Sequence, residues 1–176
     1  MYPVVRLITS SLMATRKPKL EPGGISEMSF YARPWDLDMF LEMNNGRVLT
    51  LFDLSRFDLS IRTGFAKALW DNKWGLAVAG STIQYRKRVR LFNKVTMHSQ
   101  LVGIDEKWLF VAQSMWVRGK PTSAALLRTC VTSPKGTVPT PEVLAAMGIE
   151  SFNPELPEWA KDWERMDKSR PWPPSP

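Results

Sequence analysis

The chain has 176 residues, 44% of them hydrophobic, which is enough for one buried core but short for two independent domains. A single cysteine, Cys130, excludes an internal disulfide, and a single histidine, His98, excludes most transition-metal sites, so we expect neither a metal nor a cofactor. The net charge of +7 favours an anionic partner: nucleic acid, a phospholipid surface or a phosphorylated small molecule. Charges interrupt every apolar stretch, so a soluble protein in a reducing, cytoplasmic setting is expected.

Residues 1–24 form a basic arm, which carries four Lys or Arg side chains and an apolar stretch before its first acid, Glu21. Such an arm is typical of a helix on a membrane surface or of an organelle transit peptide. The alternative is a helix that packs on its own domain or on a partner. The run Pro22-Gly23-Gly24 then marks a boundary.

The segment 25–136 is expected to form the main domain, beginning with a strand and a long helix. From Ile25 to Arg33 apolar and polar residues alternate with the period of a half-buried strand. Asn44 and Asn45 can then cap a helix that stops at Gly64. This helix is apolar over so much of its circumference that we expect a sheet to wrap it.

Four more strands are expected after a short helical piece at 65–70. They are predicted at 76–85, 94–103, 107–118 and 122–132. The short connections between them indicate an antiparallel meander. One strand, one long helix and four strands is the order of a hotdog, an α+β fold in which a five-stranded antiparallel sheet wraps a central helix. His98 and Cys130 fall within these strands and are interpreted as structural.

Residues 137–176 are expected to hold one short helix and a tail. Thr140 and Pro141 can begin the helix, which runs through Met147 and is closed by Gly148. The remainder is rich in proline and tryptophan and is predicted to be extended, with its tryptophans docked on the domain or on a dimer mate. A disordered ligand for another partner is the alternative.

The informative segment lies just ahead of the long helix. It contains three acids followed by two asparagines and a glycine: Asp36, Asp38, Glu42, Asn44, Asn45 and Gly46. Taken alone, these residues are explained by capping, because acids and asparagines satisfy free N–H groups and complement the helix dipole.

Residues 35–64, WDLDMFLEMNNGRVLTLFDLSRFDLSIRTG, resemble the D-x-D-x-x-x-H-x-N-N segment of the 4-hydroxybenzoyl-CoA thioesterase-like hotdog superfamily, particularly its bacterial and THEM6-like members. Weaker similarity extends over residues 25–135. In that superfamily the second aspartate of the motif is catalytic, and this position is Asp38. Two positions depart from the pattern: Glu42 replaces the motif histidine, and Val48 replaces the usual aromatic residue.

The resemblance implies an acyl-CoA thioesterase that forms a homodimer, or a dimer of dimers, with sheets joined edge to edge and each active site completed across the interface. Asp38 can attack the thioester carbonyl or act as a general base on water. The N–H groups around Asn45 and Gly46 can polarise the carbonyl oxygen. Asp36, Asn44 and Glu42 are expected to support them, with Glu42 pointing either into the pocket of Asp38 or outward.

The densest basic cluster includes Arg86, Arg88 and Arg90, which can meet the phosphates of coenzyme A. The alternative is a solvated strand end that protects a sheet edge. We do not favour nucleic acid as a partner, because most aromatic residues fall at positions typical of a core. The main competing function is a non-hydrolytic module that binds acyl-CoA or an acyl-carrier protein; a hotdog dehydratase is disfavoured because the motif lacks histidine.

Overall fold

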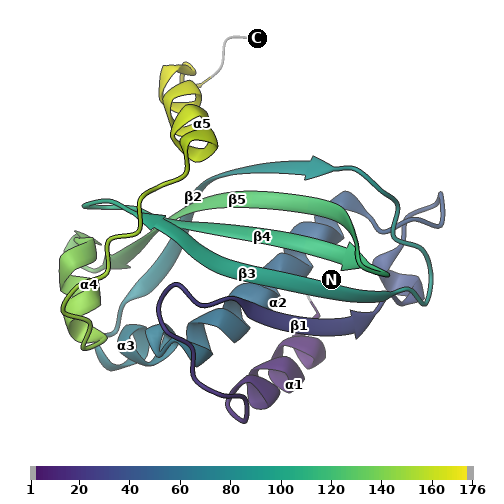
Figure 1. Cartoon of the computed structure of the whole chain (residues 1–176), viewed down its shortest axis with the longest axis horizontal. Helices are drawn as coiled ribbons and strands as arrows, with labels where there is room; N and C mark the ends of the chain where they lie inside the picture. The colour runs from purple at the N-terminus through teal and green to yellow at the C-terminus, as the bar shows by residue number, and fades with distance from the viewer. Residues whose placement is uncertain (1–2, 174–176) are drawn as a thin grey trace.

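The computed structural model describes residues 3–173. A curled antiparallel sheet wraps a long helix, so the hotdog arrangement expected from the sequence is confirmed (Figure 1). The elements, in chain order, are α1 (Val4–Ala14), β1 (Ser26–Tyr31), the 3-10 turn η1 (Pro34–Asp36), α2 (Asn45–Arg62), α3 (Phe65–Asp71), β2 (Gly75–Tyr85), β3 (Lys94–Ile104), β4 (Leu109–Val117), β5 (Lys120–Ser133), β6 (Gly136–Val138), α4 (Thr140–Ala146) and α5 (Glu158–Ser169).

The strands lie side by side in the order β1-β3-β4-β5-β2. These are the five strands predicted from periodicity, and the short β6 adds a sixth that pairs with β5. Each neighbouring pair is antiparallel. The predicted meander holds for β3, β4 and β5 but is wrong for β2, because β2 pairs with β5 at the far edge of the sheet while β3 lies between β1 and β4. Within residues 3–173, β2 pairs with β5 alone, so its outer edge is open to a further strand.

The core lies between α2 and the inner face of the sheet. Val48, Leu51, Phe52 and Leu54 of α2 are buried there with side chains from the strands. Burying one such side chain stabilises the fold by about 1.5–3 kcal/mol, so this packing holds α2 against the sheet. Gly64 ends the helix region with a φ of +80°, a left-handed conformation that glycine adopts without strain.

A chain of polar side chains also joins α2 to the middle of the sheet. Ser55 and Ser99 are hydrogen-bonded at 2.7 Å, and Gln113 Nε2 donates to Ser99 Oγ at 2.6 Å and to the Phe52 carbonyl at 2.9 Å. Arg56 extends this network by donating to Gln113 Oε1 at 2.7 Å. Because all of these groups are paired, the network fixes the position of α2 without leaving a buried polar group unsatisfied.

The basic arm packs on the domain through one side of α1. Leu7 contacts the main core, and Ala14 is buried. Arg6 pairs with Asp36 at 3.1 Å, while Lys17 pairs with Asp58 at 2.7 Å. The opposite side of α1 exposes several apolar residues: Val4, Val5, Ile8 and Leu12. Within residues 3–173, no helix is long and apolar enough to cross a membrane.

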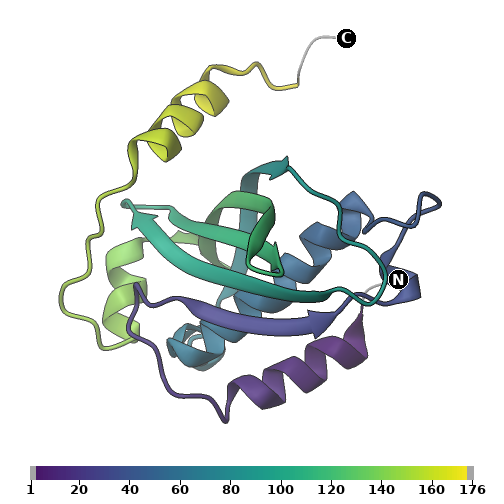
Figure 2. The same ribbon diagram turned by 45° about the vertical axis from the view of Figure 1, so that its right-hand side comes forward.

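The predicted extended tail is wrong over residues 158–169, which form α5. The prolines on either side of this segment led to the prediction of an extended tail. In the structure, Lys161 Nζ donates to the carboxylates of Glu158 and Glu155, and these hydrogen bonds support the helix locally. Its inner side packs on the outer face of the sheet through Ala160 and Trp163. The Arg128 guanidinium lies over Trp163 and also pairs with Asp167, which anchors the helix. In Figure 2, α5 projects away from the body of the domain.

Candidate active site

Asp38 lies in a tight loop between η1 and α2. Its backbone N–H donates to the Glu42 carbonyl at 2.8 Å, and its Oδ1 accepts from Phe40 N at 2.8 Å. Leu41, at the turn of this loop, has a φ of +59°, which is costly for a residue with a side chain. The loop therefore holds the Asp38 carboxylate half-buried, with one oxygen engaged by the backbone of the loop itself.

Asp36 is fully buried beneath this loop, so it cannot reach a substrate. Its carboxylate pairs with Arg6 at 3.1 Å and Arg47 at 3.5 Å, and it accepts from the Arg33 N–H at 3.0 Å. A buried charge is tolerated only when it is paired and hydrogen-bonded. The Asp36 carbonyl also accepts from Asn44 N at 3.0 Å, so this residue positions both ends of the loop.

The start of α2 has the capping arrangement expected from its sequence. Asn44 is the N-cap, and its side-chain oxygen accepts from Arg47 N at 3.2 Å. The first N–H groups of a helix have no partner within the helix, so those of Asn45 and Gly46 are directed out of its end. A Cβ at Gly46 would lie 3.2 Å from Asn44 Oδ1, so the glycine leaves room for the cap.

A cleft of about 220 Å³ opens beside the helix start. Its lining comes from the loop before α2, the first turn of α2, the end of β2 with the following segment, and β5: Glu42, Met43, Asn45, Val48, Tyr85, Arg86, Lys87, Arg88, Val89 and Ser123. Glu42 therefore lines the cleft, where it pairs with Arg88 at 2.9 Å. Asp38 is not part of the lining, but its backbone N–H donates to the carbonyl of Glu42, which is.

The basic cluster is a loop that is fastened to the Asp38 loop. Met43 N donates to the Val89 carbonyl at 2.9 Å, and Glu42 and Arg90 form an isolated antiparallel bridge. Arg86 and Arg88 line the cleft, but Arg90 does not. The structure thus brings the predicted acidic and basic groups to one end of α2, although Arg90 does not line the cleft.

Tyr85 is a site residue that the sequence analysis missed. Its hydroxyl donates to the Asn45 carbonyl at 3.3 Å, so it lies directly beside the helix start. Burial raises the pKa of this phenol above its ordinary 10.0, and the group keeps its proton at neutral pH. Its place at the end of a strand, immediately before the basic cluster, was the signal in the sequence.

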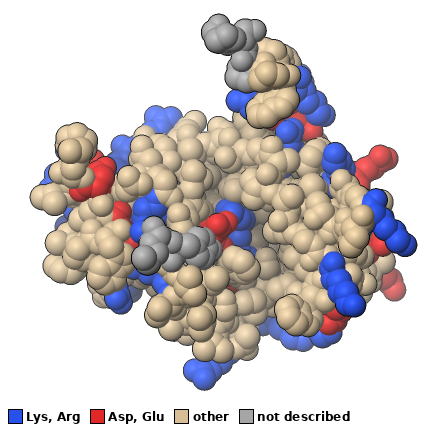
Figure 3. Space-filling model, turned by 180° about the vertical axis from the view of Figure 1, so that it is seen from behind, with Lys and Arg blue, Asp and Glu red and all other residues tan. Residues whose placement is uncertain are grey.

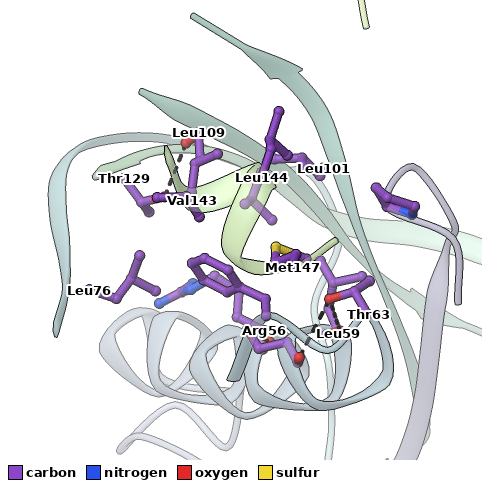
Figure 4. Close-up of a pocket in the computed structure, with 14 residues that line it drawn as sticks. Arg56, Leu59, Thr63, Leu76, Leu101, Leu109, Thr129, Val143, Leu144 and Met147 are labelled. Carbon is purple, nitrogen blue, oxygen red and sulfur yellow. Dashed lines mark hydrogen bonds between the residues drawn. The ribbon is translucent and has the colours of Figure 1, made fainter. Parts of the chain in front are cut away.

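An apolar pocket lies at the opposite end of α2. Leu144 of α4, Met147 directly after α4 and Leu59 of α2 point toward one another across it (Figure 4). Leu76 of β2 also lines it, and α4 closes it. The enclosed volume is about 60 Å³, and nearly all of the wall is apolar. This pocket suits a hydrocarbon or aromatic group and offers little to a polar one.

Other candidate groups are structural. His98 Nε2 lies 3.2 Å from Glu27 Oε2 on the neighbouring strand, and Cys130 is buried. No cluster of at least three His, Cys, Asp or Glu side chains able to hold a metal occurs in residues 3–173. On the face opposite to that of Figure 1, Lys and Arg side chains are scattered and form no single basic patch (Figure 3).

Comparisons with known proteins agree with this fold. The Protein THEM6 of Xenopus laevis is 30% identical over 138 residues, which cover 77% of this chain and 65% of the relative. This chain thus matches just under two thirds of that relative's length.

Solved structures show the same fold at low identity. YbaW, a probable thioesterase from Escherichia coli, aligns with a TM-score of 0.64 at 21% identity, covering 69% of this chain and 98% of that one. A hypothetical thioesterase with coenzyme A from Streptococcus pneumoniae TIGR4 aligns with a TM-score of 0.55 at 15% identity, covering 74% and 95%. The model of the thioesterase-like superfamily matches residues 32–148. This chain therefore belongs to the thioesterase-like superfamily.

Proposed function

We propose that this protein hydrolyses the thioester of an acyl-CoA at the start of α2. The observation that carries the proposal is the meeting of three groups there. A held carboxylate at Asp38, the open N–H groups of the helix end and a cleft lined by arginines share one end of the molecule. These supply a base or nucleophile, a site for the developing oxyanion and a site for phosphate.

In this mechanism the thioester carbonyl oxygen lies against the N–H groups of Asn45 and Gly46. Asp38 removes a proton from water, whose oxygen adds to the carbonyl carbon, or it attacks that carbon itself to give an anhydride that water then opens. The C–S bond breaks, the acid leaves, and the coenzyme A thiolate takes a proton. The Tyr85 phenol, which keeps its proton and lies beside the helix start, can pass that proton to the thiolate and regain one from the water consumed in the hydrolysis, so that the protons balance over the cycle.

Coenzyme A would lie along the cleft. Arg86, Lys87 and Arg88 line it and carry the positive charge that a diphosphate requires. Glu42 neutralises Arg88 in the structure, so binding of coenzyme A must compete with this ion pair, whose atoms are 2.9 Å apart. A second candidate is a module that binds acyl-CoA without hydrolysing it, and it is favoured by Glu42, which occupies the position of the motif histidine and is engaged with Arg88.

The acyl group would enter the apolar pocket of a second copy. The open edge of β2 can pair with the same strand of another chain around a two-fold axis, as antiparallel strands do. Leu76 at one end of β2 lines the apolar pocket, while Tyr85 at the other end lines the cleft. Pairing centred on the strand thus brings the cleft of each copy beside the pocket of the other.

The test is thiol release from a panel of short, long and aromatic acyl-CoAs. Asp38→Asn should lower kcat by about 10² or more, as loss of a catalytic carboxylate predicts. Asp71→Asn, a change of the same kind at an exposed acid on α3, should leave it unchanged. If the wild-type protein releases no thiol but binds acyl-CoA in calorimetry, hydrolysis is excluded and the binding module is the better description.

A further inference from the structure

Large apolar side chains crowd the tips of the two loops at the cleft end. Met39 is 86% exposed, Phe40 75% and Phe92 68%. Together with their exposed neighbours they form a surface that we term the apolar rim: Trp35, Met39, Phe40, Leu41, Leu91 and Phe92. Contiguous apolar surface of this kind marks an interaction site in a folded protein.

The apolar rim is one rigid surface, although its residues come from two loops. Phe92 N donates to the Ala32 carbonyl at 2.9 Å, just beyond the end of β1. The Met43 N–H donates to the Val89 carbonyl at 2.9 Å, and Glu42 and Arg90 form a bridge. The two tips are therefore fastened to one another and to the sheet, so they can meet a partner together.

Basic side chains surround the apolar rim. Arg33 lies over the Trp35 ring at 5.4 Å, and Arg86, Lys87 and Arg90 are exposed on the adjoining loop. The acids of these loops are largely engaged, because Asp36 is buried with two arginines and Glu42 pairs with Arg88. The surface is thus apolar at its tips and positive around them.

An apolar surface surrounded by positive charge is complementary to a phospholipid membrane, in which acyl chains lie below anionic headgroups. Apolar tips reach the boundary between headgroups and chains, and each nearby Lys or Arg adds attraction to a negative leaflet. A second copy fits less well, since two such rims placed face to face would bring like charges together. The first turn of α1, joined to this end by the Arg6–Asp36 pair, adds the exposed Val4 and Val5.

We propose that the apolar rim docks the protein on an anionic phospholipid surface, with Met39, Phe40 and Phe92 entering the headgroup layer. Given the proposed thioesterase function, docking sets the cleft at the membrane, where an acyl-CoA whose chain lies in the bilayer can reach it. The substrate class is then an acyl-CoA that partitions into membranes.

The test is co-sedimentation with vesicles of phosphatidylcholine alone and of phosphatidylcholine mixed with phosphatidylglycerol. The wild-type chain should bind the mixed vesicles more tightly, and added salt should weaken binding. Met39→Ser combined with Phe92→Ser should reduce affinity about tenfold, because two large apolar side chains no longer enter the layer. Trp70→Ser, at an exposed aromatic on α3, is the matched control and should bind as the wild type does.

Three outcomes would overturn docking through the rim. The first is that the wild type does not bind the vesicles, and the second is that the Trp70→Ser control loses as much affinity as the double variant. The third is a change of assembly size in light scattering for the double variant, which would assign the apolar rim to contacts between copies. The vesicle assay needs no turnover, so its result is independent of whether the protein hydrolyses thioesters. Thiol release from a short, soluble acyl-CoA should be the same in Phe92→Ser alone and in the wild type, because Phe92 lies outside the loop that holds Asp38.

Discussion

The two ends of α2 differ in almost every property that matters for binding. At its start, half-buried and exposed charges surround a polar cleft, and open N–H groups point outward. At its end, α3 and α4 close a nearly apolar pocket. The contrast teaches that one helix can contribute to two different kinds of site, because its dipole acts only at the first turn while its side chains line a pocket several turns later.

A buried aspartate also lies near each end of α2. Replacing these aspartates should produce the largest effect among the tests that compare the two ends. Asp36 pairs with Arg6 and Arg47, and Asp58 with Lys17 and Arg62. Asp36→Asn and Asp58→Asn should each lower the unfolding free energy by about 3 kcal/mol, because each leaves two partly buried cations without their buried counter-charge. Urea denaturation measures this loss.

Only the Asp36 change should also alter turnover of the folded protein, since Asp36 positions the loop of Asp38. The measurement is kcat at a temperature where both variants remain folded by circular dichroism. Equal losses of kcat in the two variants would contradict a special role for the start of α2.

A second test fills the pocket at the other end. Leu144→Trp places a larger side chain in the enclosed space, whose volume is only about 60 Å³. kcat/KM for the longest accepted acyl chain should fall about tenfold, whereas the shortest should be nearly unaffected, because only a long chain needs the pocket. Ala146→Leu, on the exposed side of α4, is the matched control. A uniform loss across all chain lengths would argue that the pocket does not receive the acyl group.

The smallest effect is expected at Tyr85. Tyr85→Phe removes one hydrogen bond and one proton donor while keeping the ring, so kcat should fall about fivefold. The loss should be smaller for a thioester whose leaving thiol is more acidic, because such a thiolate needs no proton in order to depart. An equal fall in kcat for both leaving thiols would mean that Tyr85 only positions Asn45 and donates no proton.

Much of this fold was predictable because its signals are local. The alternation in β1 and the asparagine cap and Gly64 stop of α2 each act within a few residues. α5 was missed because its stability comes from Ala160 and Trp163 packing on a distant sheet, which no local pattern reveals. Tyr85 was missed for the same reason, since its neighbour Asn45 lies forty residues away in the chain.

The hydrogen bonds that join Ser55, Ser99 and Gln113 limit where residues can be inserted into this protein. Inserting one residue into α2 ahead of Ser55 would turn the rest of the helix by about 100° and carry Ser55 away from Ser99. Ser99 and Gln113 would then remain buried with fewer partners. Changes in length are therefore far better accommodated in the loops at either end of α2 than within it, so new substrate preferences should arise there.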